Sequence, residues 1–147
     1  DSALNVRECL KVHDVFVANR SYTHLIGQPV KLETLAREPL VLLEQASNSR
    51  KYLDDFCSLN GITLHPEIEL GAHSLLVEFS RIGLGVACIT REFAVRALSS
   101  GELVELELET PLPPRAIGLI SLEGVPLSAA ADRFIQIVMN EAGKTRG

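Results

Sequence analysis

The segment from residue 72 to residue 90 constrains the fold more than any other part of the sequence. Its first half carries Leu75, Phe79 and Ile82 at helical spacing, with Leu76 widening the stripe, so we expect a helix that turns this apolar side towards the core. An unbroken apolar run over residues 86–89 follows, which is typical of a strand buried on both faces. The segment therefore predicts a helix that leads directly into a strand of a parallel sheet.

Predicted strands and helices alternate along most of the sequence. In the helix that follows residues 45–50, we expect Leu53, Phe56 and Leu59 to face inward. Alternation of this kind indicates an α/β fold with a mainly parallel sheet. Apolar runs predict strands at residues 15–18, 40–43, 86–89 and 117–122, and the alternation of apolar residues with glutamates predicts another, with one exposed face, at residues 68–70.

The last third of the sequence carries two further patterns. Apolar residues and glutamates alternate over residues 104–109, which predicts a strand with one exposed face. Ser128 is suited to cap a final helix, in which Phe134, Ile137 and Val138 would belong to a buried stripe.

Length and charge narrow the classes of function. The 147 residues are enough for one domain with its own core, or for one compact piece of a longer protein, as the start at Asp1 suggests. No apolar run approaches the roughly 20 residues of a membrane helix. The net charge of −5 argues against a surface that grips the phosphates of DNA.

The metal-binding residue types do not form a recognisable site. Cys9, Cys57 and Cys88 and the four histidines stand at no spacing typical of a metal centre, so we expect no metal and no cofactor. Cys57 and Cys88 lie within apolar patterns. We expect them to be buried structural thiols of a reducing cytoplasm rather than a redox switch.

No catalytic motif is present in the sequence either. Gly83 and Gly85 stand between a helix and a strand, which is the reverse of the order in a dinucleotide-binding motif. Glu105, Glu107 and Glu109 are explained better as the solvated face of a strand than as catalytic carboxylates. We therefore predict a binding protein and not an enzyme.

Three junctions between a strand and the segment after it could bind a ligand. They are Ala46–Arg50, Gly71–Ser74 and Thr90–Arg91, and all three are polar. In open α/β sheets, ligands lie beyond the carboxyl ends of strands, where helix N-termini offer free N–H groups and a positive dipole. At each junction, simple capping of the helix is the alternative explanation.

Several segments, in order, resemble one known family. The pattern S-L-L-V-x-x-x-x-x-G-L-G-V-A-x-I-T over residues 74–90 resembles a segment of the effector-binding domain of LysR-type transcriptional regulators. Residues 32–40, Gly101–Leu106 and Phe134-Ile135 fit further segments of that family. One departure is that Leu25 follows His24 where the family has a proline.

The resemblance implies a fold like that of type 2 periplasmic binding proteins, with two α/β lobes. On this mapping, residues 13–100 form a complete second lobe, and residues 1–12 and 101–147 form the remainder of the first lobe. The opening part of the first lobe and a DNA-binding winged helix-turn-helix would precede Asp1. The implied function is ligand sensing for transcriptional control in the cytoplasm. A solute-binding protein of a transport system, with the same fold, is the alternative.

The resemblance also implies partners and a site. The effector would lie in the cleft between the lobes, and two converging helix N-termini would favour an anion such as a small carboxylate. A homodimer would use the helix at residues 75–82 and the strand at residues 86–89, and DNA would be bound only through the helix-turn-helix. The candidate effector-binding residues are Ser47, Asn48, Ser49, His73, Ser74 and Thr90.

Overall fold

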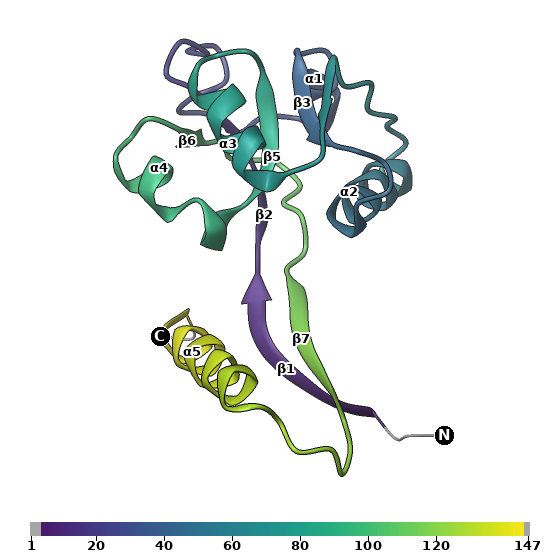
Figure 1. Cartoon of the computed structure of the whole chain (residues 1–147). Coiled ribbons are helices and arrows are strands. Elements are labelled where there is room, and N and C mark those ends of the chain that lie inside the picture. Colours follow the sequence, from purple (N-terminus) through teal and green to yellow (C-terminus); the bar gives the residue numbers. More distant parts are fainter. Residues whose placement is uncertain (1–3, 146–147) are drawn as a thin grey trace. The chain divides into compact units, whose positions relative to one another are not determined.

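The computed structural model describes residues 4–145, with the side chains of residues 10–118 and 120–137. The chain forms two compact units (Figure 1). The central unit is His13–Pro113, and the flanking unit consists of Asp1–Val12 and Pro114–Gly147.

Residues 101–113 pack with the central unit, whereas the boundary predicted from the sequence follows residue 100. Strand β6 (Val104–Glu105) pairs with strand β2 (Asp14–Ala18), and the backbone N–H of Val30 donates to the carbonyl of Glu107. These bonds hold the segment to the central sheet, and the chain leaves that unit only after Pro113.

The central unit is built on a five-stranded sheet in the order β4-β3-β5-β2-β6. Strand β3 (Leu40–Leu43) runs parallel to β4 (Ile68–Leu70) and to β5 (Val86–Thr90). Strand β2 is antiparallel to both of its neighbours. The α/β architecture is confirmed, but the sheet is mixed rather than mainly parallel, since two of its four strand pairings are parallel and two are antiparallel.

Helices cover both faces of this sheet. Because successive strand residues point to opposite faces, Phe16 and Leu42 join one apolar cluster, whereas Val17 and Val41 join another. Helix α2 (Asn48–Leu59) contributes to the first cluster and helix α3 (His73–Arg81) to the second. The remaining helices of the unit are α1 (Leu32–Leu35), the 3-10 turn η1 (Arg91–Phe93) and α4 (Val95–Ser99).

The expected inward face of α3 is only partly confirmed, since Leu76 is buried and the two ends of the stripe are not. Leu75 and Ile82 are 43% and 59% exposed, and the buried residues of the helix are Leu76 and Ser80. A serine can face the core here because the Ser80 hydroxyl donates to the carbonyl of Leu76 at 2.8 Å. The buried stripe is thus rotated from the expected one, and the apolar side chains at positions 75 and 82 face solvent.

Helix α2 shows a similar correction at its end. Leu53 is buried as expected, but Leu59 is 88% exposed. The buried stripe consists of Arg50, Leu53 and Cys57, at helical spacing. A charged residue can belong to that stripe only because its guanidinium has polar partners, which are described with the site below.

The flanking unit is a two-stranded ribbon with one helix. Strand β1 (Leu4–Val12) pairs antiparallel with β7 (Arg115–Leu122), and helix α5 (Ala129–Thr145) packs against β1. Ser128 caps α5 as expected, since its hydroxyl accepts the N–H of Ala131 at 3.1 Å.

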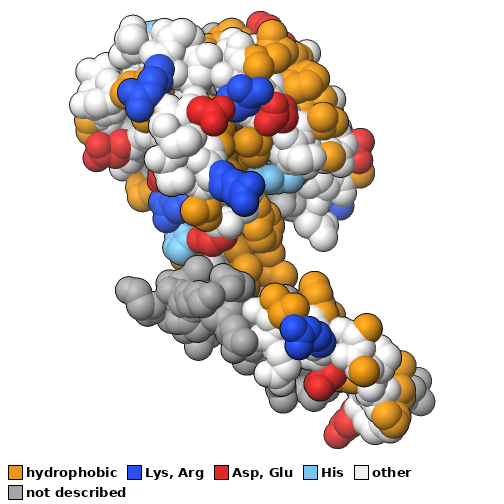
Figure 2. Space-filling model, turned by 60° about the vertical axis from the view of Figure 1, so that its left-hand side comes forward, with side chains coloured by type: hydrophobic (Ala, Val, Ile, Leu, Met, Phe, Trp, Pro, Cys, Tyr) orange, Lys and Arg blue, Asp and Glu red, His pale blue; other side chains and the backbone are white. Residues whose placement is uncertain are grey.

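The stripe expected to be buried on α5 is open to solvent. Phe134 and Ile137 are 57% and 52% exposed, and Val138 lies outside the described side chains. Apolar side chains of the ribbon, among them Ile120, are also exposed, and Figure 2 shows such side chains on this unit. A ribbon of two strands is too small to cover an amphipathic helix on its apolar face.

The step from α3 into β5 depends on two glycines. Gly83 has a φ of +86°, a left-handed conformation that ends α3. Gly85 lies so close to β3 that a Cβ atom there would be 2.7 Å from the carbonyl oxygen of Pro39. The glycine thus permits β5 to pair with β3 at the centre of the sheet.

We predict that Gly85→Ala destabilises the protein by about 1–3 kcal/mol, because the added methyl group overlaps backbone that cannot move freely. Gly71→Ala is the matched control, since its Cβ would meet nothing closer than 3.9 Å. Urea unfolding of both variants tests this. Equal stability of the two variants would contradict the close approach at Gly85.

Candidate functional site

The three polar junctions lie at one edge of the central sheet. Because β3, β4 and β5 are parallel, their carboxyl ends meet at the same edge. Helix α2 begins there after β3, helix α3 begins there after β4, and Thr90 is the last residue of β5. The sheet therefore brings together segments that are some 20 residues apart in sequence.

A small hollow lies at this edge, with free space of about 20 Å³. That space suits roughly one water molecule or one polar group of similar size. We call it the site hollow. Its lining includes Asp14, Ser49, Arg50, His73, Cys88 and Thr90. Ser49, His73 and Thr90 belong to the six predicted residues, and each comes from a different junction.

The other three predicted residues do not line this hollow. Ser47 is the N-cap of α2, and its hydroxyl accepts the N–H of Arg50 at 3.4 Å. Asn48 is exposed in the first turn of the same helix. Ser74 is exposed too and is not a cap, because α3 begins at His73 and Ala72 occupies the N-cap position.

His73 is held in one defined hydrogen-bonding state. Its Nε2 accepts the backbone N–H of Thr90 at 2.9 Å, which leaves the ring proton on Nδ1. The ring also meets the edge of Phe93 at a centroid distance of 5.8 Å. Burial lowers the pKa of His73 from its ordinary 6.5, and the nearby Asp14 carboxyl opposes this only in part.

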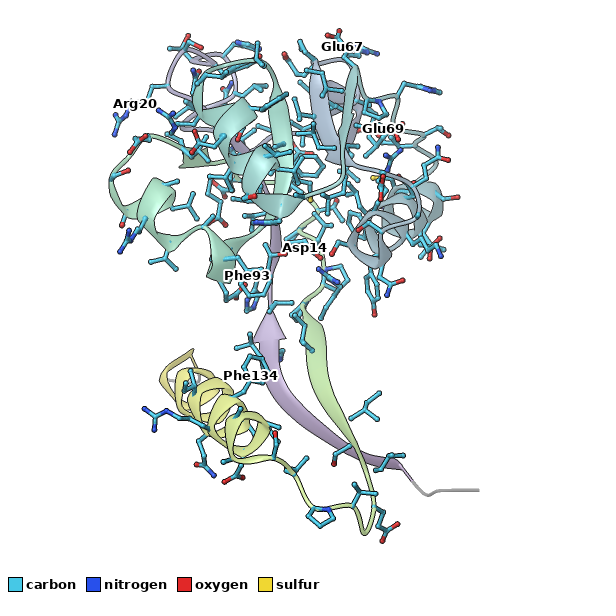
Figure 3. The ribbon with its side chains drawn as sticks, in the orientation of Figure 1. Asp14, Arg20, Glu67, Glu69, Phe93 and Phe134 are labelled. Carbon is cyan, nitrogen blue, oxygen red and sulfur yellow. The ribbon has the colours of Figure 1, made fainter. Side chains whose placement is uncertain are left out.

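Asp14 and Thr90 form a buried polar pair. They lie opposite each other in the antiparallel pairing of β2 with β5, and the Thr90 hydroxyl donates to Asp14 Oδ1 at 3.4 Å. Only 8% of Asp14 and 4% of Thr90 are exposed. Figure 3 shows Asp14 at the start of β2. Sequence reasoning placed Asp14 only in the break before a strand, and no signal marked it as part of a site.

Arg50 closes the predicted junction Ala46–Arg50 but was not among the six candidate residues. It is 3% exposed, and its Nη1 donates to the carbonyl of Leu43 at 2.9 Å. Its Nε donates to both carboxylate oxygens of Asp54, at 3.0 and 3.1 Å. The spacing of Arg50 and Asp54, one helical turn apart, was the available signal. The guanidinium is therefore hydrogen-bonded to the end of β3, and the Asp54 carboxylate largely compensates its charge.

The cysteines differ from one another. Cys57 is buried, and burial together with the Asp54 charge raises the pKa of its thiol to about 11, so it is an unreactive core residue as expected. Cys88 is only half-buried and lines the site hollow. Both are free thiols, and the Cys9 side chain lies outside the described residues.

The described part of the chain contains neither a metal-binding cluster nor a membrane-spanning helix. No group of three or more His, Cys, Asp or Glu residues there is placed to hold a metal ion. None of the helices in that part is both long and apolar enough to cross a membrane.

The lowered pKa of His73 predicts how stability depends on pH. The imidazole of the unfolded chain takes up a proton near pH 6.5, whereas that of the folded chain does so only at a lower pH. The unfolded state therefore binds more protons in this window, and the free energy of unfolding falls as the pH drops below 6.5.

We expect His73→Gln to flatten this dependence, measured as urea unfolding between about pH 7.5 and pH 5. His65→Gln is the control, because His65 is an exposed histidine in a loop. A slope unchanged in His73→Gln would contradict the burial of a neutral imidazole. The pKa of the Glu92 carboxyl is also lowered. Its protonation affects the free energy of unfolding only around and below the ordinary carboxyl pKa of 4.5, which is outside this window.

Comparisons with known proteins agree with this architecture. The family model described as the LysR substrate binding domain matches residues 1–143. The HTH-type transcriptional activator CmpR of Synechocystis is 27% identical over 124 residues, which are 84% of this chain and 36% of the activator. The uncharacterised HTH-type transcriptional regulator YeiE of Escherichia coli is 31% identical over 73% of this chain and 36% of its own length.

Solved structures show the same fold. The CcmR regulatory domain of Synechocystis, in complex with 2-PG, has a TM-score of 0.78 at 19% identity, covering 97% of this chain and 68% of that one. The effector-binding domain of QuiR, in complex with shikimate, has a TM-score of 0.74 at 16% identity, covering 96% and 66%. They confirm the predicted class, an α/β fold like that of type 2 periplasmic binding proteins.

The chain spans about a third of the length of the two curated relatives, at 36% of each. Their names favour a transcription regulator over the transport component that was the alternative. Since the family model covers residues 1–143 of the 147, the chain belongs to the LysR substrate binding domain family.

Proposed function

We propose that this chain is the effector-binding part of a LysR-type transcription regulator and that the site hollow receives the anionic group of a small effector. One observation carries the location of the site. Ser49 follows β3, His73 follows β4 and Thr90 ends β5, and all three line one hollow.

The hollow offers hydrogen-bond donors to an incoming oxygen atom. Ser49 brings a hydroxyl and stands in the first turn of α2, where backbone N–H groups have no partner within the helix. His73 brings its Nδ1–H, since its Nε2 is already bonded to Thr90. The space of about 20 Å³ admits one oxygen-bearing group, so the rest of the effector would lie outside the hollow.

The charges around the hollow limit the effector further. The positive charge of Arg50 is already shared with Asp54, and the Asp14 carboxyl lines the same space. Binding of an anion would therefore rest on helix N–H groups and side-chain donors more than on a free cation. A singly charged group such as a carboxylate suits this balance, and shikimate, the compound in the QuiR complex, carries one.

The role of the whole protein follows from its relatives. Both are named HTH-type regulators, so we infer that DNA is contacted by a helix-turn-helix outside this chain, in a cytoplasmic protein without enzymatic activity. The net charge of −5 supports the inference that this chain does not itself contact DNA, because an acidic domain is repelled by DNA phosphates.

We predict that Ser49→Ala weakens binding of a carboxylate effector by about tenfold or more, because one hydrogen bond to a charged group is lost. Calorimetric titration of the protein with a panel of small carboxylates, shikimate among them, would give the affinities. Ser49→Ala should not remove a helix cap, since Ser47 is the N-cap of α2.

Ser47→Ala is the matched control. It should cost about 1 kcal/mol of stability through the lost cap while leaving effector affinity nearly unchanged. If Ser47→Ala and Ser49→Ala reduced affinity equally, the effect would come from helix stability, and the site would have to lie elsewhere.

We also infer that the protein forms a homodimer through the exposed face of α3. Leu75 and Ile82 are 43% and 59% exposed, with the half-buried Phe79 between them on the same face. Figure 2 shows apolar side chains at the surface of the central unit. An exposed apolar stripe on an amphipathic helix is typical of a surface that a partner covers.

Ile82→Asp should weaken self-association of the protein by about tenfold or more, because it places a charge in an apolar contact. Sedimentation velocity over a range of concentrations measures this. Leu59→Asp is the control, since Leu59 is an even more exposed apolar residue, on α2. Loss of dimer in both variants, or in neither, would contradict a contact at α3.

A further inference from the structure

The chain passes between its two compact units at two places. One passage lies between Val12 and His13, and the other lies between Pro113 and Pro114. The proline rings fix φ at both residues of the second passage and remove both N–H groups. The first passage has no such constraint, so its conformation depends on the hydrogen bonds that hold His13.

Glu92 holds His13 by both its backbone and its side chain. The N–H of His13 donates to Glu92 Oε2 at 2.9 Å, and the imidazole Nδ1 lies 2.5 Å from Glu92 Oε1. The adjacent N–H of Arg91 donates to the carbonyl of His13 at 2.8 Å. We call these three contacts the His13–Glu92 clasp.

The environment of Glu92 indicates that the clasp is formed by an ionised carboxylate. Its side chain is 13% exposed. Burial is the largest single influence on the pKa of Glu92 and raises it, but the hydrogen bonds from His13, a backbone hydrogen bond of Glu92 itself and the charge of His13 together lower the pKa from its ordinary 4.5. The neighbouring Arg91 does not form its ion pair with Glu92, because its guanidinium pairs with Glu105 at 2.5 Å.

The clasp is continuous with the site hollow. Thr90 lines the hollow and directly precedes Arg91 and Glu92, while Asp14 lines it and directly follows His13. Thr90 is fixed by two bonds, one from its N–H to His73 Nε2 and one from its hydroxyl to Asp14. A group that enters the hollow beside His73 and Thr90 would therefore contact one end of the segment whose other end is hydrogen-bonded to His13.

We propose that Glu92 is a positioning residue that couples the occupancy of the site hollow to the passage between the two units. The coupled element is the segment Thr90–Glu92, whose one end lines the hollow and whose other end holds His13. This inference rests on the proposed function, in which the hollow is the place where an effector is sensed.

Amide hydrogen exchange of the whole chain, followed by NMR without any ligand, tests the clasp. In Glu92→Ala, the amide of His13 should exchange about tenfold faster or more, because its acceptor is gone. In the control Glu109→Ala, which removes an exposed glutamate of the same unit, it should not change. The amide of Val41, in the core of β3, reports global stability. Unchanged exchange at His13 in Glu92→Ala would overturn the clasp.

A second variant tests the coupling. His73→Ala removes the acceptor of the Thr90 N–H and should speed exchange at both Thr90 and His13, with Val41 unaffected. Faster exchange at Thr90 alone would overturn the coupling. If Glu92→Ala does not fold, Glu92→Asp, which keeps the charge but shortens the side chain, should give the same faster exchange at His13.

These outcomes are independent of effector binding. Faster exchange at His13 in both variants, with no carboxylate bound by the wild type, would remove the proposed function and leave the mechanical link intact. Ser49-dependent binding without an effect of His73→Ala on His13 would overturn the link and leave the proposed function.

Discussion

The parallel pairing of β3 with β4 and with β5 is the constraint on which the candidate site depends. Its register sets Leu43 opposite Leu70 and Leu40 opposite Val86, so the three strands end at one edge. Helices α2 and α3 then both begin at this edge, and Ser49 and His73 from their first turns line the same hollow. The pairing with β5 requires the backbone approach that only Gly85 permits.

Buried polar groups give this edge its fixed geometry. Arg50, Asp14 and Thr90 are each more than nine-tenths buried. Asp14 starts β2 and Thr90 ends β5, while Arg50 of α2 donates to the carbonyl of Leu43 at the end of β3. Within the described residues, every buried side-chain nitrogen or oxygen has a hydrogen-bond partner. Burying any of these groups without a hydrogen-bond partner would cost free energy. The network therefore resists rearrangement and keeps the hollow preformed.

The strands were predictable from sequence, and the helix faces were not. The runs at residues 40–43 and 68–70 match β3 and β4, because a run that is apolar throughout, or one that alternates, has few alternatives to a strand. On α3, the apolar residues were numerous enough to form a stripe through Leu75 or through Leu76. Contact with the sheet selected Leu76, and the bond from Ser80 to the Leu76 carbonyl made the choice possible.

The sequence by itself determined the elements, their order and the polar junctions after three strands, since local periodicity and capping chemistry depend only on neighbouring residues. Only the tertiary structure decided that Ser49, His73 and Thr90 meet in one hollow while Asn48 and Ser74 do not line it. It also decided that Arg50 and Asp14 are buried there and that residues 101–113 join the central unit. These outcomes depend on strand register and on hydrogen bonds between residues distant in sequence. Neither the register nor these hydrogen bonds can be predicted from a local sequence pattern.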